Sequence, residues 1–136
     1  MNKERLLELA DLLETEKVAK HWDMDNYFVD EGSRMNRKLG TLLDNCGAAA
    51  CIAGWSIAKF DPDTPINYSE VKDRAASILD MDWDDASALF TPETVTTWTK
   101  ISPTDAAQTI RSYVETGVVD WSWHPAYEGE IEDDED

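Results

Sequence analysis

At residues 45–60 the chain reads NCGAAACIAGWSIAKF, a run of small and apolar residues with a single charged side chain, Lys59. A helix of this composition has apolar residues on nearly all sides, which is typical of a buried helix. Gly47, Gly54 and the alanines lack bulk, so neighbouring helices can approach closely, and close packing offsets the low helix propensity of glycine. We therefore expect a central helix here, with the other helices packed around it.

The chain before this segment predicts one helix and a polar loop. Asn2 can cap a helix that ends near Lys20. Its apolar face consists of Leu6, Leu9, Ala10 and Leu13. Residues 21–28 mix aromatic and turn-forming residues, which indicates a packed connection or a short strand. Residues 30–38 are polar and form the expected loop.

The chain after this segment contains several helix starts. Ser69 can cap a helix, and Asp82 can cap another that turns Trp83, Ala86, Leu89 and Phe90 inward. Thr91-Pro92-Glu93 and Ser102-Pro103-Thr104-Asp105 each place a hydroxyl at the N-cap, proline at the first helical position and an acid in the first turn.

The last predicted helix ends at Gly117, which suits the residue that closes a helix. After it, Val119, Trp121 and Trp123 alternate with Val118, Asp120 and Ser122, which predicts a short extended segment. Together these elements predict an all-α fold, an irregular bundle of five to six helices around the small-residue central helix. Residues 1–127 would form one domain, and residues 128–136 an acidic tail that is disordered.

Charge is the unusual property of this sequence. Twelve basic residues stand against twenty-nine acidic ones, a net charge of −17. Residues 1–60 carry ten acids and eight bases, whereas residues 61–136 carry nineteen acids and four bases. The second half is acidic throughout, because residues 61–127 alone hold twelve of those acids. Such a field repels nucleic acid and anionic membranes and attracts basic protein surfaces.

The cysteines and histidines give weak indications of chemistry. Cys46 could lie just before the central helix, where the helix dipole lowers a thiol pKa, but His21 and His124, the histidines of the sequence, stand in no recognisable motif. Cys46 and Cys51 do not form a disulfide framework, and reduced thiols fit a cytoplasmic protein. We expect no catalytic residue, and a cysteine-dependent enzyme stays an open alternative.

The sequence predicts neither a metal site nor a cofactor. Asp80-Met81-Asp82-Trp83-Asp84-Asp85 opens like a calcium-binding loop, with acids at alternate positions. That motif also needs glycine at its sixth position and glutamate at its twelfth, where this chain has Asp85 and Thr91. A helix start rich in acids explains the run better. No glycine-rich phosphate loop, zinc-type cysteine pairing or serine nucleophile motif is present.

The segments Cys46–Phe60, Ala76–Pro92 and Ser102–Trp121 resemble a group of small uncharacterised helical proteins from phages and bacteria. The shared features are a Cys-Gly-x-x-x-Cys-x-Ala-Gly core helix at Cys46–Gly54, a Leu-Phe-x-Pro pattern at Leu89–Pro92 and the sequence Glu-Thr-Gly-Val-Val-Asp-Trp at Glu115–Trp121. The resemblance implies a phage or prophage setting, in which small acidic proteins often inhibit host defence systems, and it implies no catalytic residue.

We therefore predict an acidic phage-type protein that binds and inhibits a basic, nucleic-acid-binding host protein in the host cytoplasm. Mimicry of DNA is one way in which it would act, and acidity that only confers solubility stays an open alternative. The alternative is an interaction module that uses an exposed aromatic patch formed by Trp121 and Trp123. Neither hypothesis involves direct binding of nucleic acid or membrane. The predicted partner-binding residues are Asp63, Glu70, Asp73, Asp80, Asp82, Asp84, Asp85, Glu93, Asp105, Trp121 and Trp123.

Overall fold

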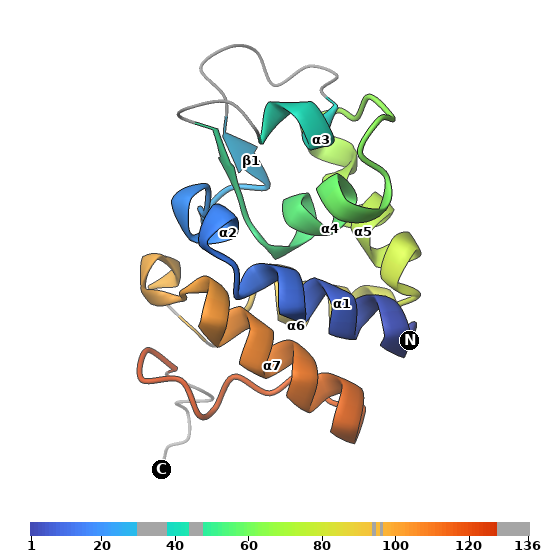
Figure 1. Ribbon diagram of the computed structural model, residues 1–136. Coiled ribbons are helices and arrows are strands. Elements are labelled where there is room, and N and C mark those ends of the chain that lie inside the picture. The colour runs from blue at the N-terminus through green and yellow to red at the C-terminus, as the bar shows by residue number, and fades with distance from the viewer. Residues whose placement is uncertain (30–37, 44–47, 94, 96, 128–136) are drawn as a thin grey trace.

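The computed structural model describes residues 1–29, 38–43, 48–93, 95 and 97–127. The predicted tail and Cys46 lie outside these residues. The protein is mostly helical, which confirms the predicted irregular helical bundle. In Figure 1, α1 lies side by side with α7 in the lower half of the molecule, and α4 lies beside α5 above them.

The helices are α1 (Lys3–Leu13), α2 (Glu16–Lys20), α3 (Leu39–Leu42), α4 (Ile52–Phe60), α5 (Val71–Leu79), α6 (Trp83–Phe90) and α7 (Pro103–Thr116), with 3-10 turns η1 (Tyr68–Glu70) and η2 (Trp98–Lys100). The strands β1 (Phe28–Val29) and β2 (Ala49–Ala50) form a short antiparallel pair in which Phe28 lies opposite Ala50. For residues 21–28 the sequence predicts either a packed connection or a short strand, and β1 begins at the end of this range. Among the described residues the sheet consists of these two strands.

The small-residue segment forms a shorter helix than we predicted. Cys51 is extended and acts as the N-cap, so α4 begins at Ile52. The residues before it are in β2, where Ala50 exchanges main-chain hydrogen bonds with His21 and Asp23. Gly54 does allow a close approach, since a Cβ there would collide with the carbonyl oxygen of Tyr27 and lie 2.7 Å from the Ala50 Cβ, but these neighbours belong to the chain before β1 and to β2 and not to the predicted neighbouring helix. The small residues thus serve both a strand and a helix.

The first predicted helix is divided into α1 and α2. Asn2 caps α1 as expected, because its side chain accepts a hydrogen bond from the Arg5 amide, and the predicted apolar face is buried. The helix ends before Lys20 because Thr15 is extended and its hydroxyl donates to the Leu12 carbonyl. A threonine that bonds a local carbonyl competes with the helical main chain, which explains the break.

Two helix starts in the second half differ from the prediction. Asn67, not Ser69, is the cap, and it forms a capping box with Glu70 at the start of η1. Thr91-Pro92-Glu93 starts no helix, because Thr91 closes α6 and its hydroxyl donates to the Ser87 carbonyl at the preceding turn. The sequence Thr91-Pro92-Glu93 is typical of an N-cap, but the Thr91 hydroxyl bonds to the last turn of α6 and not to the residues that follow.

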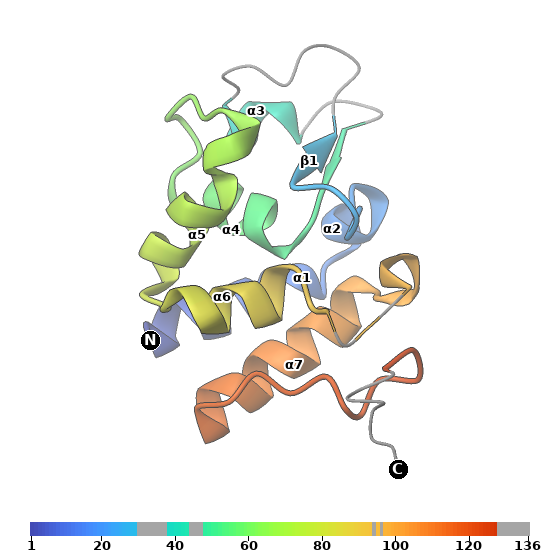
Figure 2. The same ribbon diagram turned by 180° about the vertical axis from the view of Figure 1, so that it is seen from behind.

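The caps of α6 and α7 are as predicted. The Asp82 side chain accepts from the Asp85 amide, and Ser102 and Asp105 form a capping box at the start of α7. The helix α7 ends at Gly117, which has a positive φ of 81°, a conformation that glycine adopts without strain. Beyond it, residues 118–127, here called the C-terminal segment, run back along the body as an irregular stretch. Figure 2 shows this segment and α6 on the same side of the molecule.

Candidate functional site

Most of the predicted acidic surface faces solvent. Of the nine predicted acids, seven are exposed: Asp63, Glu70, Asp73, Asp80, Asp82, Asp84 and Glu93. They lie on the loop after α4, on η1 and α5, at both ends of the turn into α6, on α6 itself and on the turn after it. We call these seven residues the acidic surface. Glu70, Asp73 and Asp84 lie within helical elements, and the other four lie on turns and loops beside them.

The other two predicted acids bond to the protein body. The Asp85 carboxylate accepts a hydrogen bond of 2.9 Å from the Tyr113 hydroxyl. Burial, together with this carboxylate, raises the pKa of Tyr113. Asp105 accepts from the main chain of Ser102 and from His124 Nε2 at 2.8 Å. Both acids therefore stabilise the fold, and they are less available to a partner than the seven exposed acids are.

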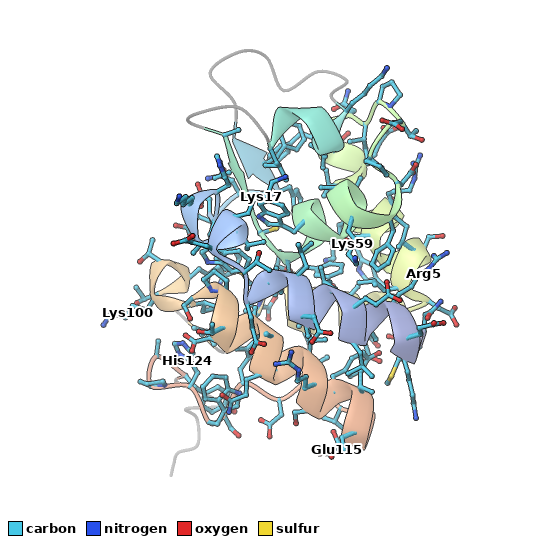
Figure 3. All side chains as sticks on the ribbon, in the orientation of Figure 1. Arg5, Lys17, Lys59, Lys100, Glu115 and His124 are labelled. Atoms are coloured by element: carbon cyan, nitrogen blue, oxygen red, sulfur yellow. The ribbon has the colours of Figure 1, made fainter. Side chains whose placement is uncertain are left out.

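His124 is buried between two tryptophan rings and anchors the C-terminal segment. The rings of Trp121 and Trp123 lie edge-on to it, with centroids at 6.3 and 5.4 Å. Its Nδ1 accepts from the Ala126 amide at 3.0 Å, so in the neutral ring Nε2 carries the proton and donates to Asp105. Both ring nitrogens are used, which gives this histidine a structural role. Figure 3 shows it beside the start of α7.

The bases of the same half of the chain are largely engaged. Arg74 Nη1 lies 2.6 Å from Asp61 Oδ2, and Arg111 pairs with Asp11 and Glu14 of α1. The Lys72 ammonium donates to the Ser87 hydroxyl at 2.6 Å and lies 4.1 Å from the Trp83 ring centroid.

Within the described part of the chain, no ion pair involves Asp63, Glu70, Asp73, Asp82, Asp84 or Glu93. Asp80 differs, since it lies 3.3 Å from the terminal amino group. Apart from Asp80, the acidic surface therefore presents carboxylates that form no ion pair within the described molecule. Figure 3 shows several of the bases of the first half, Arg5, Lys17 and Lys59, on the elements α1, α2 and α4.

A pocket of about 370 Å³ opens between α6, the turn that follows it and the C-terminal segment. Three carboxylates line it, those of Asp84, Glu93 and Asp120. Its apolar lining includes the rings of Trp121 and Tyr127. Three of the predicted partner-binding residues therefore meet in one depression, from three different parts of the chain. We call it the α6 pocket.

The carboxylate of Asp120 is held in its charged form. It accepts a hydrogen bond of 2.9 Å from the Ser122 amide. Hydrogen bonding from Ser122 lowers the pKa of Asp120 from its usual value, since these bonds favour the ionised group.

The predicted exposed pair of tryptophans is not present. Trp121 is 3% exposed and its indole N–H donates to the Ala88 carbonyl at 2.9 Å, whereas Trp123 is 37% exposed. The C-terminal segment is irregular and not the predicted alternating extended segment, since Trp121 points inward beside α6 as the alternation predicts, whereas Trp123, on the same predicted face, is exposed. The most exposed tryptophan among the described residues is Trp83, at 55%, which the sequence predicts to point inward.

The sequence did not predict the positions of three residues in this region, namely Trp83, Asp120 and Tyr127, for two different reasons. Trp83 shares a helical face with Ala86 and Phe90, but it is the first residue of α6 and extends past the helices that bury the rest of that face. No local signal reveals this. Asp120 and Tyr127 reach the α6 pocket only because the C-terminal segment folds back, a long-range contact that a sequence pattern does not contain.

The cysteine-enzyme alternative receives no support from the described thiol. Cys46 lies outside the described residues. Cys51 is buried, and burial raises its pKa to about 11, which makes it a poor nucleophile at neutral pH. Among the residues that the structure covers, no three histidine, cysteine, aspartate or glutamate side chains are grouped so as to hold a metal ion.

Comparisons with protein-family models, with curated proteins and with solved structures found no match to this chain. The resemblance to phage and bacterial proteins therefore stays a prediction. No helix in the described ranges has the length and apolar character needed to span a membrane.

Proposed function

We propose that this chain is an acidic phage-type protein that binds and inhibits a basic, nucleic-acid-binding protein of the host by occupying its nucleic-acid surface. The observation that carries the proposal is the acidic surface itself, seven exposed acidic residues on helices, turns and loops of the folded body. The phage setting rests on the resemblance described above. The proposal involves no catalysis and no cofactor.

The charge arrangement supports competition with nucleic acid. Duplex DNA carries one negative charge per ~1.7 Å of axis, so a competitor must present several carboxylates close together. Here Asp80, Asp82 and Asp84 follow one another across the turn from α5 to α6, and all three are exposed. Glu70 and Asp73 continue the surface along η1 and α5. A basic surface evolved for phosphates would meet a comparable series of negative charges.

A charge-matched capture experiment tests this proposal. The surface variant replaces Asp63, Asp73, Asp80 and Asp82 with Asn, which keeps the cap of α6 because Asn is a good N-cap. The control variant removes the same number of exposed charges elsewhere, through Glu4→Gln, Glu16→Gln, Asp25→Asn and Glu115→Gln. Glu115 lies at the end of α7 (Figure 3).

Wild-type protein, surface variant and control variant are each used to capture proteins from nuclease-treated bacterial lysate at about 0.1 M salt, near physiological screening. We expect wild type and control to retain a basic, nucleic-acid-binding protein that elutes with rising salt and with added duplex DNA. The surface variant should retain at least tenfold less of this basic protein than wild type does. Equal capture by all three proteins would contradict the proposal.

A second candidate function is an interaction module that binds through aromatic contact. The observation that favours it is Trp83, a large exposed ring beside the acidic residues Asp82 and Asp84, since tryptophan often anchors protein interfaces. This function predicts a partner that resists elution by salt and is lost from Trp83→Ser. Retention of the partner by that variant would argue against it.

A further inference from the structure

The α6 pocket differs from the rest of the acidic surface because it combines charge with depth and aromatic rings. The exposed acids of η1 and α5 stand on open surface, whereas Asp84, Glu93 and Asp120 surround a depression of about 370 Å³. This volume lies at the lower end of the roughly 300–1,000 Å³ typical of ligand pockets. The pocket is therefore suited to one long side chain or a short group, and not to a broad surface.

The wall of the pocket already binds a cation of the protein. Ser87, which lines the pocket, accepts a hydrogen bond from the Lys72 ammonium, and the same ammonium lies over the ring of Trp83. The exposed side of α6 thus uses a hydroxyl and an aromatic face to hold a positive charge. Among the described residues no ion pair joins Lys72 to any of the three lining acids, so the pocket stays negative and able to accept a second cation.

The chemistry of the lining favours a guanidinium group. A guanidinium is planar, binds carboxylates through two parallel hydrogen bonds and stacks on aromatic rings, whereas an ammonium is a compact and strongly hydrated charge. Three lining acids and the half-buried Tyr127 match the first set of properties. A metal ion fits less well, since no group of potential ligands comes together among the described residues.

We propose that the α6 pocket accepts an arginine side chain presented by the basic partner. This inference rests on the proposed function, and it adds a specific contact to the general attraction of opposite charges. An arginine that reaches into the pocket would set the orientation of the partner, because the exposed acids alone allow many orientations. Nucleic-acid-binding proteins carry arginines for phosphate contact, so the partner class supplies this side chain.

The test uses blocked tripeptides with Arg, Lys or citrulline as the central residue, titrated into the ¹⁵N-labelled full chain. We expect the Arg peptide to shift the Trp121 indole N–H and the main-chain amides of Val119 and Asp120 in a saturable manner. The Lys peptide should bind several-fold more weakly, and the neutral citrulline peptide should produce no shift. Shifts of equal size across the whole acidic surface would overturn the proposal.

Matched variants separate the pocket from its surroundings. Glu93→Gln with Asp120→Asn removes two lining charges and keeps an oxygen that can accept from Ser122, while Asp73→Asn with Asp63→Asn removes two charges outside the pocket. We expect the first pair to weaken the Arg peptide at least tenfold and the second pair less than twofold. Equal weakening by both pairs would overturn the pocket as the binding site.

The capture experiment distinguishes failure of this inference from failure of the proposed function. The pocket variant is the protein that carries Glu93→Gln and Asp120→Asn. If it retains the basic partner as well as wild type does, while the surface variant loses the partner, the arginine contact is wrong and the proposed binding through the acidic surface is supported. If neither variant loses the partner, both are wrong. Loss from the pocket variant at unchanged thermal stability supports the inference.

Discussion

The helices α4 and α6 are nearly equal in length, yet they use their residues in opposite ways. In α4 every residue from Ile52 to Ile57 is buried, and its sequence contains no acid. In α6 one face packs inward while Asp82, Trp83 and Asp84 face solvent at its start. The comparison teaches that, under the proposed function, stability and binding belong to different helices. Substitutions in α4 should therefore change the free energy of unfolding, and substitutions at the start of α6 should change binding.

The largest expected effect comes from a pair of tryptophans, one in each helix. Trp55 is 3% exposed and its indole N–H donates to the His21 carbonyl at 3.0 Å, whereas Trp83 is 55% exposed. Trp55→Ala should lower the free energy of unfolding by about 3–5 kcal/mol, the usual cost of removing a buried aromatic side chain. Trp83→Ala should cost about 0.5 kcal/mol or less, as exposed substitutions do. Urea unfolding measures both, and similar values would break the comparison.

The next effect tests the close packing at α4. Gly54→Ala should lower the free energy of unfolding by about 3 kcal/mol, the upper range for overpacking, because the added methyl meets main-chain atoms of Tyr27 that cannot rotate away. Ala58→Gly in the same helix serves as a control for helix propensity and should cost about 1 kcal/mol. If Gly54→Ala left the midpoint of urea unfolding unchanged, the chain before β1 would have to move away from α4 at little cost.

The buried thiol at the start of α4 predicts sensitivity to alkali. Burial raises the pKa of Cys51 from 9.0 to about 11, so the thiol stays neutral in the folded state when it would ionise in the unfolded chain. Its stabilising contribution is complete below pH 9 and is lost as the pH rises toward 11, a change on the order of 2 kcal/mol. Burial also raises the pKa of Tyr27 and Tyr113, which act in the same direction.

Urea unfolding at pH 7, 9 and 10.5 measures this loss. Cys51→Ala removes the ionising group, so its stability should fall less steeply with pH, although its stability at pH 7 is lower. If wild type and variant lose stability in parallel, Cys51 does not ionise on unfolding as proposed. In a Cys46→Ser variant, alkylation of Cys51 at pH 8 should be slow until the protein unfolds.

The smallest expected effect on stability comes from the acidic surface. The surface variant should raise the free energy of unfolding by less than about 1 kcal/mol, since it relieves repulsion in a chain of net charge −17. The gain should shrink at about 0.5 M salt, where the charges are screened. A marked loss of stability would show that these carboxylates hold the fold together, and it would weaken the assignment of binding to this region.

The sequence predicted elements where local chemistry decides them. Asn2, Asp82 and Ser102 cap helices as expected because each cap is a bond between near neighbours. The prediction failed at Thr91, where the same residue type closes a helix by bonding backwards. Local pattern does not determine which of these two bonds forms.

The candidate site was predicted only in part, because local chemistry decides some of its features and long-range contacts decide the others. Exposure of seven acids follows from the cost of burying charge, so composition was a good guide. Asp85 and Asp105 turn inward because Tyr113 and His124 come from distant parts of the chain to meet them. The α6 pocket depends on the return of the C-terminal segment, which no periodicity encodes.

The tryptophans also give the molecule an optical property. Among the six, Trp22, Trp55, Trp98 and Trp121 donate their indole N–H groups to main-chain carbonyls and Trp123 donates to a threonine hydroxyl. Trp83 is the most exposed of those rings and lies between two exposed carboxylates. The Lys72 ammonium lies 4.1 Å from the centroid of this ring, so caesium ions, which the carboxylates attract, should reach the ring from its open side. Its fluorescence should therefore be quenched more readily by caesium than by iodide, which the carboxylates repel. The acidic surface thus carries its own reporter, whose quenching by caesium should decline when a basic protein covers it.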